Sequence, residues 1–255
     1  MQLVSTLEKA ASRGWTETVN KICSIIFKTT NNDDNLEVLG IKLFCMMKNA
    51  SKNSNLDSWM IEELEKCNLS QRKEIVSKKF LVHLSTQTSF SVACEKGNVK
   101  LIEYFIKVCT ADIINDSTLV RQGCNQYSAT SIGIAAAYGN LEAVKTLMRY
   151  GANVDSVSNT LDTPIMLSIL NNHLEVTKHL AMNNADIFRQ NIYGKTCLML
   201  SSGKSVEMHT FLLKHEAQIM DRDMSKKRGY FITPKILAEE KADQFLKQDF
   251  EDSIF

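Results

Sequence analysis

Proline and glycine are scarce in this chain. Only two prolines and ten glycines occur among its 255 residues, which is few for an all-β sandwich that needs frequent tight turns. No stretch approaches the roughly 18 uncharged apolar residues of a membrane span. The N-terminus lacks the basic and apolar regions of a secretion signal. We therefore expect a mainly helical protein of the cytoplasm or the nucleus, with no membrane contact.

A strong net charge is also missing. The 30 Lys and Arg residues and the 29 Asp and Glu residues leave a formal charge of +1. Such a chain has no overall field that would attract a polyanion, so nucleic acid is not the expected partner. The seven cysteines are odd in number and scattered, and most lie in apolar runs. We expect reduced, buried thiols rather than a disulfide framework.

An internal repeat organises the middle of the chain. The segments that begin at Thr130 and Thr163 align without a gap, and a third copy begins at Thr196. The period is therefore 33 residues, and the third copy lacks one residue near Gly203. A fourth copy begins at Thr88. These copies predict a stack of similar units rather than helices around one central core.

Each copy has the pattern of helix, turn, helix. Thr163 is a good N-cap, and Pro164 suits the first helical position because its missing N–H is not needed there. Gly139 and Asn140 tolerate the unusual backbone angles that end a first helix. The second helix carries an apolar stripe of Leu141, Val144, Leu147 and Met148. Burial of this stripe against the next unit supplies about 1.5–3 kcal/mol per fully buried Leu, Ile or Val.

The predicted units divide the chain into three segments. Residues 1–80 hold a divergent first repeat, around residues 7–26, and a helical insertion with helices near residues 36–48 and 59–67. The middle segment, residues 81–223, holds repeats at about 88–114, 130–155, 163–188 and 196–220. A longer connection, roughly from Asp112 to Tyr127, is interpreted as an insertion on one face. Residues 224–255 are expected to form a degenerate capping repeat with a polar outer face.

The repeats resemble the ankyrin signature. That signature reads Thr-Pro-Leu-x-x-Ala-Ala-x-x-Gly-His, followed by a leucine-rich helix and Gly-Ala-x-Val, and residues 130–219 are similar to it. The resemblance implies an all-α fold, namely an ankyrin-repeat solenoid of stacked helix-turn-helix units with a divergent helical N-terminal part. It also implies a non-enzymatic module that binds other proteins.

A narrower resemblance is carried by residues 184–187 and by Tyr193-Gly-Lys-Thr-Cys-Leu-Met199. These segments are similar to the FEM (feminisation protein) family, which has an extended loop where this chain has its longer connection. The resemblance implies the N-terminal ankyrin part of a cullin-2 ubiquitin-ligase substrate receptor. Its groove would receive a protein or peptide, such as a C-terminal degron ending in arginine or a proline-rich tail. No later repeat and no cullin box is visible, so a partial chain and a shortened relative both stay open.

The sequence departs from the FEM groove at three positions. Two acidic positions of the family fall on Gln122 and Asn171, and an aromatic one falls on Gly133. An arginine degron would lose charge-assisted hydrogen bonds there, each worth roughly 1.5–3 kcal/mol. An ankyrin scaffold or competitor with no ligase link is therefore the second hypothesis.

One row of repeat-equivalent positions is the predicted binding surface. Lys96, Tyr138 and Asn171 stand at the last position of successive first helices. Ankyrin arrays present this row together with the loop tips, and the predicted site therefore also includes Gln122, Tyr127, Asn159 and Tyr193. Tyrosine in such a row is a fair anchor for a partner.

Several motifs resemble parts of enzyme sites, but a structural role is favoured for each of them. Ser201-Ser-Gly-Lys-Ser205 ends like a phosphate-binding loop, yet position 198 is Leu rather than the required glycine, so a turn between helices is favoured. Cys197 stands at a helix start and His209 on the next helix, without a third catalytic member. The five histidines show no metal-ligand spacing, and the Lys226–Arg228 run is expected to be a solvated loop. We expect neither a cofactor nor a metal.

Overall fold

The computed structural model describes residues 39–44, 47, 56–82, 85–109, 113–122 and 125–226. The divergent first repeat expected over residues 7–26 lies outside the described residues. The expected capping repeat over residues 224–255 overlaps them only at residues 224–226.

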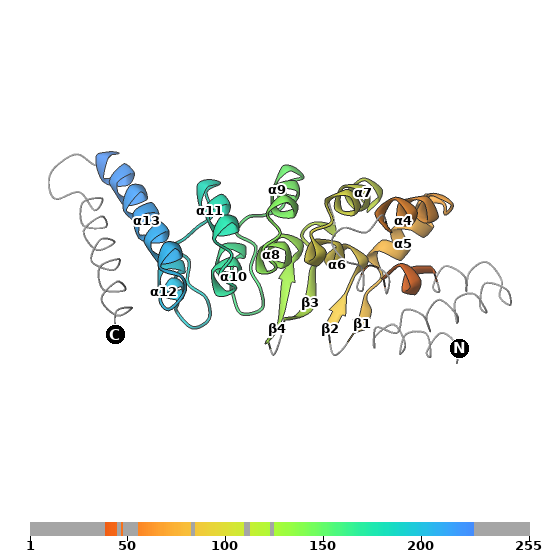
Figure 1. The fold of residues 1–255 in the computed structure, drawn as a ribbon, viewed down its shortest axis with the longest axis horizontal. Coiled ribbons are helices and arrows are strands. Elements are labelled where there is room, and N and C mark those ends of the chain that lie inside the picture. The colour runs from red at the N-terminus through yellow and green to blue at the C-terminus, as the bar shows by residue number, and fades with distance from the viewer. Residues whose placement is uncertain are drawn as a thin grey trace, which may run out of the picture.

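Paired helices dominate the described residues (Figure 1). In the described part of the chain before the repeats, residues 39–44 and 47 are helical, within the helix expected near residues 36–48. They are followed by α4 (Leu56–Glu65) and α5 (Leu69–Ser77). The first helices of the four repeats seen in this portion of the chain are α6 (Ser89–Lys96), α8 (Ser131–Ala137), α10 (Pro164–Leu170) and α12 (Cys197–Ser201). The second helices are α7 (Val99–Cys109), α9 (Leu141–Arg149), α11 (Leu174–Met182) and α13 (Val206–Lys226).

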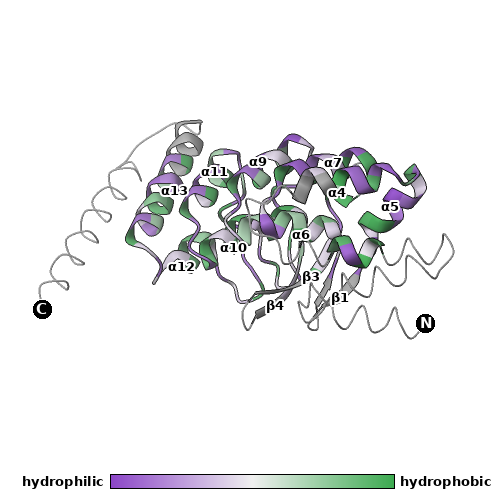
Figure 2. Ribbon diagram, turned by 45° about the vertical axis from the view of Figure 1, so that its right-hand side comes forward, coloured by the Kyte–Doolittle hydropathy of each residue, from purple (hydrophilic) through white to green (hydrophobic). Residues whose placement is uncertain are grey.

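The helices stand side by side in two rows. Figure 1 shows α6, α8, α10 and α12 in one row and α7, α9, α11 and α13 in a second row above it. Loops and hairpins project below the first helices. Hydrophilic and hydrophobic residues alternate around α13 in Figure 2, as expected for a helix with one buried side. The prediction of stacked helix-turn-helix units is confirmed.

Threonine begins the first helix of each repeat, as the sequence predicts. The Thr88 hydroxyl accepts a hydrogen bond from the Ser91 N–H, and the Ser91 hydroxyl accepts one from the Thr88 N–H, which makes a capping box. Thr196 caps α12 through the Met199 N–H. Thr163 has the same extended backbone, but its side chain makes no capping bond, and Pro164 occupies the first helical position instead.

Residues with positive φ end the first helices. Gly97, Gly139 and Asn172 have φ of 71°, 72° and 60° and stand at the same place in successive repeats. Glycine and asparagine adopt this left-handed conformation at low cost, so the chain can turn at once into the second helix. The predicted turn positions are confirmed.

Helix α8 forms the centre of the stack. Every residue from Ser131 to Ala137 is buried, because α6 packs on one side of the helix and α10 on the other. Three successive alanines, Ala135 to Ala137, keep this helix thin enough for close packing on both sides. The array therefore has a continuous core that runs from repeat to repeat.

Two β-hairpins were not predicted from the sequence. Strands β1 (Phe80–Val82) and β2 (Ser85–Gln87) form one antiparallel pair, and β3 (Ser117–Gln122) and β4 (Asn125–Thr130) form a longer one. The longer pair occupies the connection that the sequence indicated only as an insertion. Each hairpin leads directly into a first helix, so the turn residues of the repeat are extended into strands.

The segment before the repeats is partly helical. Helix α4 covers most of the segment 59–67 expected to be helical, whereas α5 was not expected. Asn68 starts α5 with a capping box to Gln71. Among the described helices, none is both long and apolar enough to cross a bilayer.

Candidate functional site: the face of loop tips and first helices

The predicted row lies along the ends of the first helices. Lys96 is the last residue of α6, while Tyr138 and Asn171 cap α8 and α10, and all three are half-buried. The Asn171 amide donates to the Leu167 carbonyl oxygen at 2.9 Å, so some of its hydrogen-bonding capacity is used within its own helix. We call the surface made by these helix ends and the loop tips the recognition face.

The predicted loop residues differ in their exposure. Tyr127 on β4 is buried, whereas Tyr193 in the loop before α12 exposes 71% of its surface. Asn159 is exposed, but its side-chain oxygen accepts a hydrogen bond from the Ser128 N–H at 2.8 Å. Gln122 ends β3 opposite Asn125. Tyr127 lies close enough to Tyr138 for the two phenols to interact electrostatically, whereas Tyr193 belongs to the loop of the fourth repeat, farther along the face.

Gly133 is not on this face. A Cβ at Gly133 would come within 3.2 Å of a Leu167 methyl and 3.3 Å of the Ala129 Cβ. Because these atoms belong to the packed contact between α8 and its neighbours, an aromatic side chain would not fit at this position without repacking.

A buried carboxylate underlies the first half of the recognition face. Glu95 on α6 exposes only 9% of its surface, and its Oε2 accepts a hydrogen bond from Gln87 Nε2 at 2.9 Å. Burial raises the pKa of Tyr127 and Tyr138 above the ordinary value of tyrosine, and the nearby Glu95 charge raises both further. Both phenols are therefore protonated at neutral pH and stand beside one negative charge. We call these four residues the Glu95 cluster.

Contacts between repeats hold Glu95 in place. The Asn140 amide donates to the carbonyl oxygens of Cys94 and Glu95 at 2.8 and 2.7 Å, which satisfies the C-terminal end of α6. In the next repeat His173 has the same role, because its Nε2 lies 3.0 Å from the Ala137 carbonyl oxygen. The turn residues therefore fix both the spacing of the repeats and the position of the Glu95 cluster.

Sequence reasoning missed Glu95. The predicted row used the last position of each first helix, and Glu95 stands one residue earlier, next to Lys96. The sequence carried little signal for it, because α6 (Ser-Phe-Ser-Val-Ala-Cys-Glu-Lys) already contains polar residues and a second charged residue at Lys96, and charged side chains are usually exposed.

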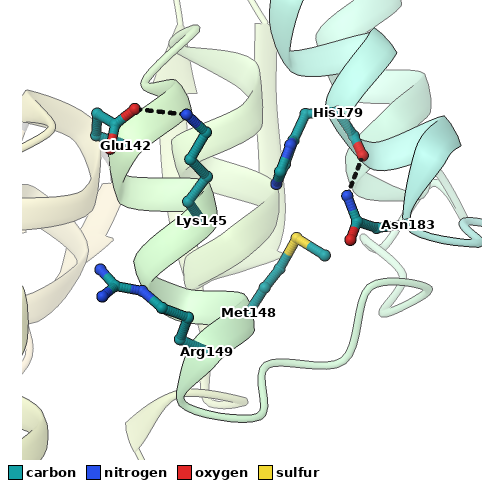
Figure 3. Close-up of a pocket in the computed structure, with 6 residues that line it drawn as sticks. All are labelled: Glu142, Lys145, Met148, Arg149, His179 and Asn183. Atoms are coloured by element: carbon teal, nitrogen blue, oxygen red, sulfur yellow. Dashed lines mark hydrogen bonds and ion pairs between the residues drawn. The ribbon is translucent and has the colours of Figure 1, made fainter.

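A depression on the opposite side of the array is a weaker candidate. It has a volume of about 580 Å³ and lies between α9 and α11, lined by Glu142, Lys145, Met148, Arg149, His179 and Asn183. Figure 3 shows Lys145 turned toward Glu142 and the Arg149 guanidinium turned away from His179. The distances agree, because Lys145 Nζ lies 2.7 Å from Glu142 and Arg149 lies 3.7 Å from Glu103. Its cations are thus already neutralised.

The enzyme-like motifs have structural roles. Lys204 Nζ donates to the Leu170 carbonyl oxygen at 2.8 Å, so the residue that suggested a phosphate-binding loop links two repeats. Burial raises the pKa of Cys197 to about 12, which keeps the thiol protonated. Within the described residues, no group of three or more His, Cys, Asp or Glu side chains is arranged to hold a metal ion.

The hydrogen bond between Ser201 Oγ and His209 Nδ1, 2.7 Å long, also has a structural counterpart. Ser168 and Thr177 occupy the equivalent positions of the preceding repeat, and their hydroxyl oxygens lie 2.7 Å apart. Because both pairs join the first helix of a repeat to its second, we interpret the Ser201–His209 pair as a helix-to-helix link.

Comparison with known proteins identifies the repeats. Residues 132–223 match the family model described as ankyrin repeats, in three copies. A stretch of 104 residues is 30% identical to protein fem-1 homolog CG6966 of Drosophila melanogaster, and it covers 38% of this chain and 16% of that protein. This similarity agrees with the narrower resemblance carried by residues 184–199.

Two further relatives are similar to part of the chain. Palmitoyltransferase AKR1 of Debaryomyces hansenii is 27% identical over 104 residues, which cover 41% of this chain and 13% of that protein. Ankyrin repeat and SOCS box protein 11 of Homo sapiens is 33% identical over 85 residues, which cover 33% of this chain and 26% of that protein. The matches thus span about a quarter or less of each relative's length.

Proposed function

Because residues 132–223 are ankyrin repeats, a fold that binds other proteins, we propose that this chain recognises a protein segment on its recognition face, as a FEM-like substrate receptor does. The observation that carries the proposal is the Glu95 cluster. It places a carboxylate and two protonated phenols at the first half of the recognition face, with Tyr138 in the predicted row and Glu95 and Tyr127 buried behind it. There they would accept hydrogen bonds from a donor-rich group of a partner. The similarity to a fem-1 homolog supports the receptor assignment.

The cluster fits a guanidinium, ammonium or amide group. Glu95 supplies the negative charge, and Tyr138 is the half-buried member that a partner reaches first. A donor that meets the carboxylate away from bulk water gains more than it would at an exposed acid, provided that its own hydrogen bonds are replaced. The site therefore offers an acidic position that the family pattern, with its acids at the positions of Gln122 and Asn171, did not indicate.

Alanine substitutions in the row test this proposal. A pull-down from source cells, probed for cullin and for co-purifying proteins, identifies the partner. Tyr138→Ala and Asn171→Ala should then each weaken partner affinity by about tenfold or more, because partly buried tyrosines anchor interfaces. Tyr150→Ala is the matched control, since Tyr150 is exposed at the end of α9, outside the recognition face. Unchanged affinity in the row variants, with unchanged melting temperatures, would remove this surface from consideration.

A scaffold or competitor without a ligase link is the second candidate, favoured by the uncharged Gln122 and Asn171 at the family's acidic positions. Arrays of partner peptides with free and amidated C-termini separate the two. A preference for free C-termini supports the receptor, and indifference supports the scaffold. An enzyme that uses Lys204 would show a nucleotide-induced rise in melting temperature, which we do not expect.

We also propose that the protein acts in the cytoplasm or the nucleus, which the free cysteines Cys67, Cys94, Cys109 and Cys197 support. Imaging of the tagged full-length chain tests this location, and it is contradicted by a signal confined to the secretory pathway.

A further inference from the structure

The second half of the recognition face exposes a group of large apolar side chains. It comprises Leu161 and Leu170 of the third repeat and Ile192 and Tyr193 of the fourth. Ile192 is 51% exposed and Leu161 42% exposed, although neither stands at the end of the described chain. We call these four residues the apolar patch.

Hydrogen bonds between the third and fourth repeats bring these residues together. The Ile192 N–H donates to the Thr160 carbonyl oxygen at 3.1 Å, so the loop that carries Ile192 lies against the loop that carries Leu161. Lys204 reaches the Leu170 carbonyl oxygen, which joins the end of α10 to the turn after α12. The loops that carry Leu161 and Ile192 thus lie side by side, and Leu170 stands at the helix end of the same face, which also holds Tyr138 and Asn171.

The shortened fourth repeat explains the exposure of Leu170. Helix α12 has five residues and α10 has seven, and the fourth repeat lacks one residue near Gly203. Counting from Thr163 and Thr196, Gly203 is the equivalent of Leu170. A Cβ placed on Gly203 would meet no atom within 4 Å. Leu170 therefore has open space where a longer repeat would place a side chain.

Leu161 has a backbone conformation that leucine avoids. Its φ is 58°, and the equivalent residue of the next repeat is Gly194, with φ of 68°. The left-handed region brings Cβ close to the following carbonyl oxygen, so glycine is the residue that fits this turn best. A leucine that exposes 42% of its surface contributes little to the core at this position, and such strain is common where a side chain serves recognition.

Two lysines border the patch. Lys195 follows Gly194 in the same loop, and Lys204 contacts the Leu170 carbonyl oxygen. Among the described residues, neither ammonium has a carboxylate oxygen within 4.0 Å, whereas Lys145 and Lys178 on the second helices are paired with glutamates. The nearby Asp162 is buried and accepts hydrogen bonds from Thr160 and Asn191. The patch therefore has a positive border.

We propose that the apolar patch and its two lysines form a specificity subsite for a segment of a partner protein in which one or two carboxylates stand beside bulky apolar side chains. The inference rests on the proposed function, because it names the chemistry of the partner on the same recognition face. Apolar side chains of the segment cover Leu161, Leu170, Ile192 and Tyr193. Its carboxylates pair with Lys195 and Lys204 at the border.

A bilayer surface fits these observations less well. Each lysine near a membrane adds only a small increment to the attraction of anionic lipids, and stable anchoring needs several such charges or a lipid chain. Two lysines and four side chains match the size of one bound segment better. Binding to vesicles is therefore an outcome that would contradict the proposal.

Selection from a peptide library tests the subsite without a known partner. A library of 12-residue peptides displayed on phage is selected for binding to the full chain and, separately, to the Lys195→Glu variant. Peptides enriched on the wild type should combine Asp or Glu with Leu, Ile, Phe or Trp, and this preference for acids should vanish on the variant. No enrichment of acids, or the same enrichment on the variant, would overturn the proposal.

Matched variants then locate the site of the best acidic peptide. Lys195→Glu should raise its Kd about tenfold, and the same reversal at the exposed Lys214 on α13 should leave it within twofold. Ile192→Ser combined with Tyr193→Ser should raise it at least tenfold, unlike Met182→Ser on the exposed side of α11. Leu161→Gly should raise it too, without lowering the melting temperature. Equal effects of the site and control variants would contradict the subsite.

The remaining outcomes separate this inference from the proposed function. If the captured partner depends on Tyr138 but the subsite variants leave its affinity unchanged, the subsite is wrong and the recognition face stands. If neither set of variants matters, both proposals fall. Sedimentation of the wild type and of Ile192→Ser/Tyr193→Ser tests for a second copy, and co-sedimentation with phosphatidylserine vesicles tests for a membrane. If the wild type forms dimers that the variant lacks, the patch binds a second copy of the chain instead. If the wild type binds vesicles and the variant does not, the patch binds a membrane instead.

Discussion

At the scale of single residues, the turn glycines differ in what surrounds them. Gly139 and Gly151 both have positive φ, 72° and 83°. A Cβ on Gly139 would lie 2.5 Å from His173 Nδ1, whereas one on Gly151 would meet nothing within 4 Å. The sequence showed glycine at both places, but only the folded structure shows that Gly139 also makes room for the histidine of the next repeat.

These two glycines give a matched pair of substitutions. Gly151→Ala should lower the free energy of unfolding only through left-handed backbone strain. The net cost is about 1 kcal/mol or less, because alanine also reduces the freedom of the unfolded chain. Gly139→Ala should cost about 1–3 kcal/mol more, because His173 must move and its contact with the Ala137 carbonyl is lost. Urea denaturation of both variants measures the difference. Equal costs would show that the turn, and not the neighbouring repeat, selects the glycine.

The limits of sequence reasoning are clear at Lys96 and Glu95. Their spacing from Thr88 follows from the repeat, so a row of helix ends was predictable. Whether Lys96 or its neighbour Glu95 is the more buried residue depends on β2, because Gln87 of this strand contacts Glu95. Because this strand was not predicted, the Glu95 cluster could not be found from spacing alone.

At the scale of elements, the two helices of a repeat are linked by polar pairs in their interior. The third repeat uses Ser168 with Thr177, and the fourth uses Ser201 with His209. Burial lowers the pKa of His209 below its usual value. The fourth repeat therefore has a titratable histidine where the third repeat has a threonine hydroxyl, which does not titrate.

Because the fourth repeat has His209 where the third has Thr177, the stability of the protein should depend on pH. Below the ordinary histidine pKa of about 6.5, the unfolded chain takes up a proton at His209 before the folded chain does. The free energy of unfolding should therefore fall as the pH drops from 7.5 to 5.5. His209→Thr, which copies the third repeat, should fall less over that range. Denaturation at both pH values checks this, and parallel changes in the two proteins would contradict it.

Helix boundaries were predictable because they depend on local residues, such as the threonine and Pro164 at helix starts. The strands were not predictable, because β3 and β4 contain Ser, Thr, Gln and Asn without a clear apolar alternation. They exist because the insertion pairs with itself, Leu119 opposite Ser128 and Val120 opposite Tyr127. Although this pairing is local, strand preference depends on the side chains that pack across the pair, which a single sequence shows poorly.

At the scale of the whole molecule, packing between repeats outweighs charge. In the ion pairs that Lys66, Lys79, Lys145, Arg149 and Lys178 make, at least one partner exposes more than half of its side chain. Such pairs contribute about 0–1 kcal/mol each. The stack is held instead by buried side chains and by links such as that from Asn140 to α6.

Folding and subsite binding should therefore respond differently to salt. Between 50 and 500 mM NaCl, the free energy of unfolding should change by less than about 1 kcal/mol. Over the same range, the affinity for an acidic peptide should weaken severalfold, because the lysines at the apolar patch are screened. Denaturation and fluorescence anisotropy in the same buffers measure both. If the stability changes strongly with salt while the peptide affinity stays constant, the charges stabilise the fold and do not contribute to binding.

Asn159 has a consequence for the solubility of the array. Its backbone N–H donates to the Ser128 carbonyl oxygen at 3.1 Å, and its side-chain oxygen accepts from the Ser128 N–H at 2.8 Å. One asparagine thus occupies both hydrogen-bonding groups that β4 presents outward at Ser128. An open strand edge is a template on which other chains aggregate. By occupying it, Asn159 lets the protein carry a hairpin beside its binding surface without inviting β-sheet growth between molecules.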